Sequence, residues 1–262
     1  MKINVSAGHA PDGGLGCGAV SLIKESTEAR KVTSKVIQYL KGQGHTVYDC
    51  TCTENAPAAT VLKKIVKKCN ENKVDLDVSI HFNSGRKDHK GDGADGGTEV
   101  LIFTAGGASE KYAKNIAAAI AELGFRNRGV KLRPDLYFLR STNAQAVLIE
   151  ACFVDDLDDI KLYDADKMAR AIVKGITGKA PTVAKTETVA EKTHEPGEFL
   201  VKVLVNELNI RTGPGTEYDV VGKIKDKGVY TIVKTSDDGK WGRLKSGSGF
   251  INISSTYCKR LG

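Results

Sequence analysis

The segment V-S-I-H-F-N at residues 78–83 decides the fold of this chain. This segment overlaps the run Val74–His81, which is typical of a buried strand. The segment nevertheless contains His81 and Asn83, which are polar residues and unusual in a hydrophobic core. Two other strand-like runs, Lys2–Ser6 and Ala146–Cys152, also deliver polar residues: the first leads into A-G-H, and the second contains Glu150. Such endings favour an open α/β sheet, whose ligand crevice lies at the carboxyl ends of its strands.

Helical patterns alternate with these strands along the first 177 residues. Apolar residues recur at helical spacing in four segments: Ser26–Gly42, Pro57–Asn72, Glu110–Leu123 and Asp164–Ile176. Two more strands are expected at His45–Cys50 and Thr98–Thr104. The alternation predicts an α/β domain over residues 1–177, with a twisted, mostly parallel sheet and helices on both faces.

The composition changes twice after this domain. Residues 178–197, G-K-A-P-T-V-A-K-T-E-T-V-A-E-K-T-H-E-P-G, carry no core pattern and are interpreted as a linker. Residues 198–262 then show short alternating runs separated by glycine turns, which predict a small all-β barrel. The runs are Phe199–Val205, Val220–Ile224, Tyr230–Thr235, Trp241–Leu244 and Phe250–Ile253.

Composition excludes several classes of protein. The six cysteines form no C-x-x-C pair and are expected to be reduced thiols. No stretch approaches the roughly 20 apolar residues of a membrane span, so no membrane insertion is expected. The opening M-K-I-N-V-S-A-G-H-A is unlike a signal peptide, which predicts synthesis in a bacterial cytoplasm without an export signal.

The net charge of +7 is concentrated toward the C-terminal end. From Glu198 onward, 11 Lys or Arg stand against 7 Asp or Glu. No basic run with interleaved aromatics is present there, so nucleic acid is not an expected partner. A mildly basic module suits a polyanionic surface such as a cell wall that bears teichoic acid.

Four residues of the first domain have the chemistry of a hydrolytic metal site. His9, His81 and a carboxylate are a common ligand set for catalytic Zn²⁺, which leaves a fourth position for water. Glu25, at the start of the first helix, is a candidate third ligand, with Glu28 as a rival. Glu150, from a different part of the chain, suits the general base. Each residue also has a structural alternative. His9 and His81 could form hydrogen bonds at strand ends, Glu25 could favour the positive end of its helix, and Glu150 could be a buried partner for an Arg.

Longer motifs favour the functional interpretation. The first domain resembles the zinc-dependent N-acetylmuramoyl-L-alanine amidases of the type-3 amidase family, in the form found in phage endolysins of clostridia and related Gram-positive bacteria. The matching pieces are V-S-A-G-H near the start, K-E at 24–25, H-T-V-Y-D-C at 45–50, S-I-H-F-N-S at 79–84, G-T-E-V-L at 97–101, R-N-R-G-V-K at 126–131 and A-V-L-I-E-A-C-F at 146–153. The sequence departs from the commonest pattern in one place, with A-G-H-A where the family has D-P-G-H-G.

The resemblance implies a sheet of about six strands and a role for each of the four residues. His9, Glu25 and His81 would bind one zinc ion, and Glu150 would be catalytic. The metal-binding Glu of the family precedes the glycine that closes its helix by about 19 residues, and Gly44 selects Glu25 over Glu28 by that spacing.

Other residues in the matched segments are candidates for contacts around the crevice. The expected substrate-binding residues are Asn83, Glu99, Arg128 and Lys131, with loop solvation or structural pairing as the alternative for each. Asn83 is also suited to orient His81. The glycine-rich, polar loop at 86–97 is expected to be a mobile flap whose His89 is solvated rather than a ligand.

The C-terminal segment N-E-L-N-I-R-T-G-P-G-T-E-Y at 206–218, followed by V-V-G-K-I and K-W-G-R-L, resembles the bacterial SH3 domains of cell-wall hydrolases. The resemblance implies that residues 198–262 bind the wall, with candidate contacts at Asn209, Arg211, Tyr218 and Trp241. A lone Trp in so small a barrel also suits the interior, which is the alternative for Trp241.

The two resemblances together imply an endolysin that lyses Gram-positive, chiefly clostridial, cells. It would hydrolyse the amide between N-acetylmuramic acid and L-alanine of peptidoglycan by zinc-activated water, on the wall, after release from the host. A zinc peptidase that cuts within the stem peptide and an inactive wall-binding protein are the alternatives.

Overall fold

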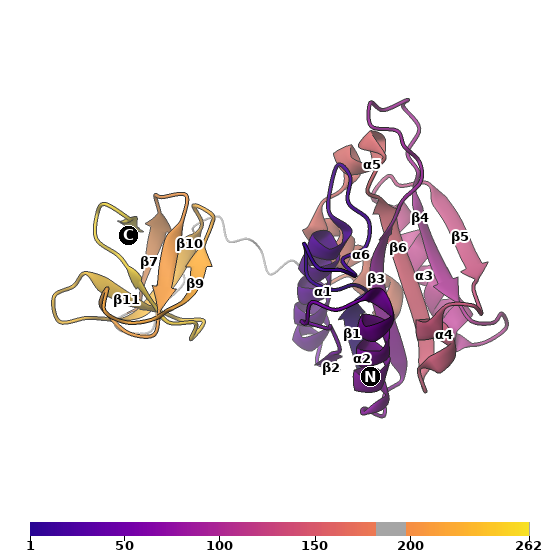
Figure 1. The fold of residues 1–262 in the computed structure, drawn as a ribbon, viewed down its shortest axis with the longest axis horizontal. Helices are drawn as coiled ribbons and strands as arrows, with labels where there is room; N and C mark the ends of the chain where they lie inside the picture. Colours follow the sequence, from indigo (N-terminus) through magenta and orange to yellow (C-terminus); the bar gives the residue numbers. More distant parts are fainter. Residues whose placement is uncertain (182–197, 262) are drawn as a thin grey trace. The chain divides into compact units, whose positions relative to one another are not determined.

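A computed structural model describes residues 1–181 and 198–261 of the chain (Figure 1). The chain divides into two compact units, Met1–Val183 and Ala184–Gly262. Most of the predicted linker, residues 182–197, lies outside the described residues. The division of the chain into an α/β unit followed by an all-β unit is therefore visible, whereas the assignment of 178–197 as a linker stays a prediction.

The first unit is built on a six-stranded mixed sheet with the order β2-β1-β3-β6-β4-β5. The strands are β1 (Lys2–Ala7), β2 (Thr46–Asp49), β3 (Leu76–Asn83), β4 (Thr98–Ile102), β5 (Asn127–Leu132) and β6 (Gln145–Phe153). β1, β2, β3 and β6 pair in parallel, while β4 is antiparallel to β6 and parallel to β5. The sheet is mostly parallel, as expected, because four of its five strand pairings are parallel, and the antiparallel pairing of β4 with β6 makes it a mixed sheet.

The reversal of β4 has a simple cause in the chain that precedes it. A parallel return to the sheet usually needs a crossover helix. Residues 84–97, between β3 and β4, contain no helix, and β4 enters the sheet in the opposite direction. As a result, the first half of β4 lies beside the carboxyl end of β6, where Glu99 is paired in register with Glu150.

Helices cover both faces of this sheet (Figure 1). α1 (Glu25–Gly42), α3 (Ala108–Ala121) and α6 (Ala165–Thr177) enclose one core, which includes Val100 and Ile102 of β4. α2 (Ala58–Asn70) and the short α4 (Tyr137–Ser141) enclose a second core, which includes Leu101. Successive residues of a strand point to opposite faces, so β4 contributes to both cores. α5 (Leu157–Leu162) follows β6.

The pattern of apolar residues explains how α1 is held. Ala29, Val32, Val36 and Leu40 are fully buried along one side of the helix. Burying a side chain of the size of Val or Leu contributes about 1.5–3 kcal/mol, which helix propensity alone does not supply. Anchored in this way, α1 holds Glu25 at its first position beneath the carboxyl edge of the sheet.

The second unit is a seven-stranded antiparallel sheet with the order β13-β7-β10-β11-β12-β8-β9. Its strands are β7 (Phe199–Val203), β8 (Leu208–Arg211), β9 (Val220–Ile224), β10 (Val229–Thr235), β11 (Trp241–Leu244), β12 (Phe250–Asn252) and β13 (Cys258–Leu261). It encloses its own core, in which Val203, Ile232 and Ile251 are fully buried. The five predicted runs are strands, and β8 and β13 were not expected from alternation.

Two expectations about composition can be compared with the structure. All six cysteines are free thiols, five of them buried. In the described part of the chain, no helix has both the length and the apolar character required to cross a membrane.

Candidate metal centre and catalytic site

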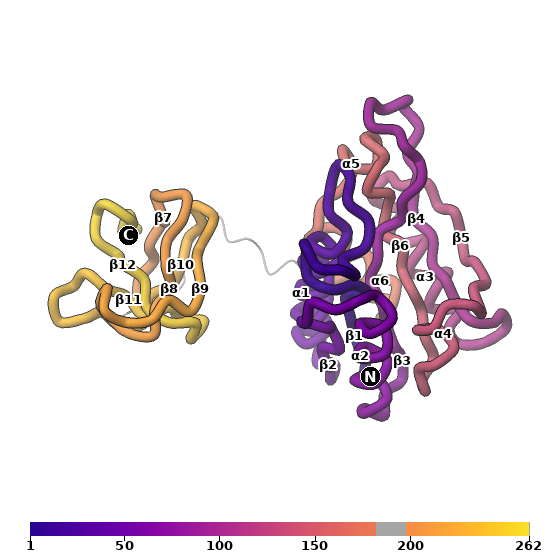
Figure 2. The backbone as a smooth tube through the Cα atoms, viewed as in Figure 1, coloured from indigo at the N-terminus to yellow at the C-terminus, as the bar shows by residue number. Residues whose placement is uncertain are grey.

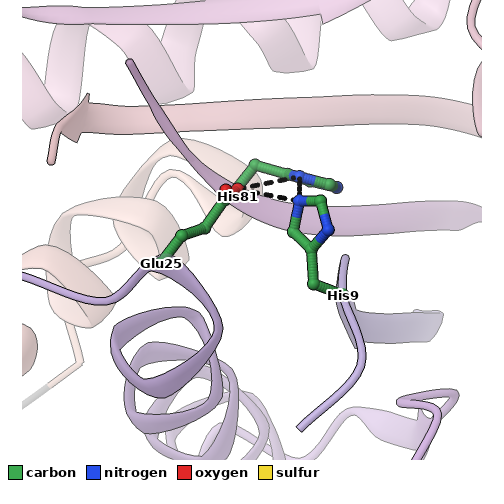
Figure 3. A group of neighbouring side chains, drawn as sticks. All are labelled: His9, Glu25 and His81. Atoms are coloured by element: carbon green, nitrogen blue, oxygen red, sulfur yellow. Dashed lines mark hydrogen bonds and ion pairs between the residues drawn. The ribbon is translucent and has the colours of Figure 1, made fainter. Parts of the chain in front are cut away.

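Three side chains from different elements meet at the carboxyl edge of the first sheet (Figure 3). His9 follows β1, Glu25 opens α1 and His81 lies near the end of β3. His9 Nε2 is 3.0 Å from Glu25 Oε1, which is 3.2 Å from His81 Nδ1, and the two ring nitrogens are 3.1 Å apart. Three potential ligand atoms thus form a nearly equilateral triangle.

The size of this triangle fits a small divalent cation. Tetrahedral zinc with bonds of 2.0–2.2 Å places neighbouring ligand atoms about 3.3–3.6 Å apart, a few tenths of an ångström longer than the separations of 3.0–3.2 Å seen here. Imidazole nitrogens and a carboxylate oxygen are also the ligand types that zinc accepts. His9, Glu25 and His81 can therefore hold a metal ion in their present positions.

Two glycines make room for these side chains. A Cβ atom at Gly8 would overlap the imidazole ring of His81. Gly18 has φ +77°, and a Cβ there would lie 2.8 Å from His9 Cδ2 and would overlap the Glu25 carboxylate. The glycines beside the first His are thus required by the close packing of the three side chains.

The protonation states of the group also suit a cation. Burial opposes the ionisation of Glu25, but hydrogen bonds with His81 and His9 outweigh it and hold the pKa of Glu25 well below its ordinary value. Glu25 also accepts hydrogen bonds from the backbone N–H groups of Phe82 and Ala19. Burial lowers the pKa of His81, which favours its neutral, ligating form. Glu25 is therefore anionic and His81 neutral at pH 7.

Neighbouring polar groups fix the two histidines. The Nε2 atom of His81 is 3.1 Å from the hydroxyl of Ser79, which leaves Nδ1 facing the ligand triangle. The guanidinium of Arg30, on α1, donates to the carbonyl oxygens of His9 and Cys52 at 2.7 Å. Such contacts orient ligands in metal sites.

Glu150 lies beside the triangle on β6, paired in register with His81 on β3. Its Oε2 atom is buried and has no hydrogen-bond partner in the described chain. Burial, together with the negative charges of Glu25 and Glu99, raises the pKa of Glu150 to about 8. This carboxyl group can hold a proton near neutral pH and has an oxygen free to exchange it.

A pocket of about 380 Å³ opens beside these residues. His9, Glu25, His81, Asn83 and Glu150 line its polar end. The rest is lined mainly by apolar residues of α2, α4 and the sheet, including Val61, Leu62, Leu101, Leu136, Phe138 and Leu148. Its volume is within the range of ligand sites.

The four predicted substrate-binding residues have different positions. Asn83 lines the pocket and donates to Glu99 Oε1 at 3.1 Å. Glu99 Oε2 accepts from Arg128 Nε at 2.8 Å, and the Arg128 guanidinium lies over the ring of Phe153. Lys131 is exposed and does not line the pocket. Asn83, Glu99 and Arg128 thus form a hydrogen-bonded chain beside Glu150, and their contacts with substrate stay a prediction.

The loop at 86–97, which was expected to be a mobile flap, is hydrogen-bonded to the segment that follows β6. Gly85 and Lys87 donate backbone N–H bonds to Asp155, and Arg86 donates to Asp156. The loop lies beside α5 in Figure 2, where Gly93 donates to Asp158. Backbone N–H groups of this glycine-rich segment therefore donate to carboxylates of residues that follow β6. The polar composition of the loop did not predict these hydrogen bonds.

His89 and a nearby acidic group do not add to the site. His89 is exposed and 3.1 Å from the hydroxyl of Ser21, as expected for a residue that is not a ligand. Asp88, Asp156 and Asp158 also lie close enough together to hold a cation. Asp156, however, is paired with Arg86 and caps α5 through the N–H groups of Asp158 and Asp159, so its charge is already compensated.

In the second unit, the four candidate wall-binding residues differ in exposure. Tyr218 is 42% exposed. Trp241 is only 8% exposed, which agrees with the alternative that this Trp fills the interior of the unit. Arg211 donates to the carbonyl oxygens of Thr216 and Tyr218 and so holds the turn between β8 and β9. Asn209 is half-buried on β8. Tyr218 is the candidate best placed for a ligand.

Sequence reasoning missed Arg133, the one Arg or Lys that lines the pocket. It follows β5, a strand that periodicity did not predict, and its backbone N–H donates to the carbonyl of Ile102 on β4. The only available signal was a basic residue just after the matched R-N-R-G-V-K segment. Placing it at the pocket required the direction of β4 and β5.

Comparisons with known proteins agree on the first unit. A family model described as N-acetylmuramoyl-L-alanine amidase matches residues 3–178. An uncharacterized protein of Clostridium perfringens is 37% identical over 86% of this chain, which spans 66% of that protein's length. The endolysin of Bacillus phage SPP1 is 27% identical, over 97% of this chain and 96% of its own.

A solved structure resembles the first unit. The catalytic domain of the CD27L endolysin, which targets Clostridia Difficile, superposes with a TM-score of 0.61 and 26% identity, over 68% of this chain and 98% of its own. The match covers nearly all of that domain, so the first unit shares its fold.

Proposed function

Because this chain belongs to the N-acetylmuramoyl-L-alanine amidase family, we propose that it is a zinc-dependent hydrolase of bacterial peptidoglycan. The bond cut is the amide between N-acetylmuramic acid and L-alanine. The observation that carries the proposal is the unpartnered Oε2 atom of Glu150 beside the triangle of His9, Glu25 and His81. A structural role for Glu150 would instead supply this buried oxygen with a partner.

His9, Glu25 and His81 are the proposed zinc ligands, and their spacing and charge support that role. Zinc bound there would polarise the scissile carbonyl and lower the pKa of a water molecule. Ser79 and Arg30 keep the two histidines in position, and the glycines at 8 and 18 leave space for the rings.

Glu150 is the proposed general base and acid. Its Oε2 atom accepts a proton from the attacking water and delivers it to the leaving alanine nitrogen. A raised pKa suits both steps, because a carboxylate with an ordinary pKa near 4.5 would hold the transferred proton too weakly at neutral pH.

The whole chain is proposed to act as an endolysin on the Gram-positive wall. The similarity to the endolysin of Bacillus phage SPP1 over 97% of the chain supports this role, and the clostridial relatives favour a clostridial wall. The second unit is proposed to be a bacterial SH3-type module that holds the enzyme on the wall through Tyr218 and Asn209. The enzyme would be made in the host cytoplasm and reach the wall after release.

Digestion of purified clostridial peptidoglycan, followed by mass spectrometry, tests the proposal. The zinc-loaded chain is expected to release stem peptides with N-terminal alanine and to leave glycan whose muramic acid lacks peptide. Chelation should stop the release and added zinc should restore it. Fragments cut inside the stem peptide would make the protein a zinc peptidase, and no release at all would point to a wall-binding protein without activity.

A further inference from the structure

The pocket beside the metal centre has two ends of different chemistry. One end carries the carboxylates of Glu25 and Glu150, with the Glu99 side chain close behind. The other end is aliphatic and aromatic, formed by Val61 and Leu62 of α2 and by residues of α4. A substrate that fills the pocket must therefore present a polar, reacting group at one end and apolar groups at the other.

This division decides which side of the scissile bond enters the pocket. A sugar ring would place several hydroxyl groups against Leu62, Leu101 and Leu148, which offer them no hydrogen-bond partners. Each hydroxyl buried without a partner costs about 1–3 kcal/mol. The methyl group of alanine and the methylenes of the next residue suit such walls. The peptide side of the scissile bond is therefore the better fit to the pocket.

Arg133 supplies the one permanent cation among the pocket-lining residues. Its side chain is 46% exposed, and Nε and Nη2 pair with Asp135 at 2.9 and 2.8 Å. That pair orients the planar guanidinium while Nη1 makes no hydrogen bond to the described chain. An oriented Arg with a free N–H edge is suited to bind a carboxylate.

We propose that Arg133 binds the free carboxylate of the acidic residue that follows alanine in the stem peptide, and so selects peptides in which this group is not amidated. The inference rests on the proposed amidase function. Among the residues that line the pocket, Arg133 is the one permanent cation, so it is the side chain that offers a carboxylate of the substrate an ionic partner.

The two basic residues singled out in the sequence are less suited to this contact. Arg128 does not line the pocket, and its guanidinium contacts Glu99 and the face of Phe153. Lys131 is exposed on β5 and outside the pocket. Lys131 is therefore a matched control for Arg133. Replacing either residue with Gln removes one positive charge, and the two positions are only two residues apart in the sequence.

Binding and turnover are measured with two matched ligand pairs. The first is the free dipeptide L-alanyl-γ-D-glutamate and its α-carboxamide, titrated into the full chain by calorimetry. The second is the same pair attached to N-acetylmuramic acid, used as substrates of the zinc-loaded chain. The variants are Arg133→Gln, Arg133→Lys and the control Lys131→Gln, with melting temperatures recorded for each.

For wild type and Lys131→Gln, we expect the carboxylate forms to bind about tenfold or more tightly than the carboxamides and to have a correspondingly lower KM. This factor corresponds to the free energy of a hydrogen bond to a charged group. Arg133→Gln should bind both forms equally, with kcat nearly unchanged, and Arg133→Lys should keep part of the preference. A preference that survives Arg133→Gln, or none in wild type, overturns the inference.

The two readouts separate this inference from the proposed function. A carboxylate preference in binding that depends on Arg133, without cleavage of the muramoyl substrates, would refute the amidase proposal and support the subsite. Cleavage at the muramic acid–alanine bond with equal rates for both forms would support the amidase and refute the role of Arg133.

Discussion

Two glutamates near the ligand triangle, Glu28 and Glu150, differ in their hydrogen-bond partners. Glu28, on α1, accepts from the hydroxyl of Tyr163 at 3.0 Å and pairs with Lys31 at 2.7 Å. Glu150 has a buried oxygen with no partner and a raised pKa. Sequence alone left Glu28 as a rival of Glu25, but its partners lie away from the ligand triangle.

Replacing Glu150 with Gln should stop hydrolysis without releasing the metal. The amide keeps the shape of the side chain but cannot accept and return a proton, so kcat is expected to fall at least about 100-fold. Zinc content, measured by elemental analysis, should stay at the wild-type level. Glu28→Gln is the control and should keep kcat, because its contacts are structural. Near-normal turnover by Glu150→Gln would exclude Glu150 as the proton carrier.

Gly18 offers a second test at single-residue scale. A methyl group there would overlap the Glu25 carboxylate and approach His9, so Gly18→Ala should weaken zinc binding by roughly 10- to 100-fold, the effect of disturbing groups that orient ligands. Gly13 also has φ +77° but no neighbour within 4 Å of a Cβ. Gly13→Ala therefore adds the same backbone strain without the clash. Equal zinc affinities in the two variants, measured by competition with a chelating dye, would refute the steric argument.

At the scale of elements, the loop between β3 and β4 depends on a buried carboxylate. Asp155 accepts the backbone N–H groups of Gly85, Arg86 and Lys87. Burial opposes its ionisation, but these hydrogen bonds outweigh burial and lower the pKa of Asp155. Lys87 has φ 57°, the only non-glycine residue with positive φ in the described chain, which lets successive N–H groups point at the same anion.

Asp155→Asn should therefore destabilise the first unit in a pH-dependent way. Because the folded-state pKa is depressed, the carboxylate contributes stability above its ordinary pKa of 3.8, and this contribution is lost as pH falls through the folded-state pKa. We expect wild type to exceed the variant by about 1–3 kcal/mol at pH 7 and by much less near pH 3. Urea unfolding at several pH values measures this, and a difference that does not change with pH would contradict the proposed role of the charge.

The elements also show how far sequence patterns reach. Buried strands such as Leu76–Asn83 and amphipathic helices such as α1 have strong periodicity, and their existence was predicted within a few residues. The edge strand β5 is half-exposed and glycine-containing, so it lacks such a signal. The direction of β4 depends on pairing across the sheet and is absent from any local pattern. Arg133 and the Glu99–Glu150 pair were therefore out of reach.

At the scale of the whole molecule, the two units have separate hydrophobic cores. All residues of the ligand triangle and the pocket belong to the first unit. A core that is complete within a unit is the condition for independent folding. Catalysis and wall binding are therefore expected to be separable, with each unit retaining its own activity.

A fragment of residues 1–181 should hydrolyse soluble muropeptides with wild-type kcat/KM but sediment poorly with insoluble wall. The expected loss of retention follows from removing the exposed Tyr218 together with the basic second unit. Within the full chain, Tyr218→Ala should reduce retention, and Tyr257→Ala is the control because it removes a tyrosine of similar exposure, 38% against 42%. Co-sedimentation of each protein with purified wall measures retention. If the fragment sediments as well as the full chain, wall binding belongs to the first unit, and the basic second unit needs another role.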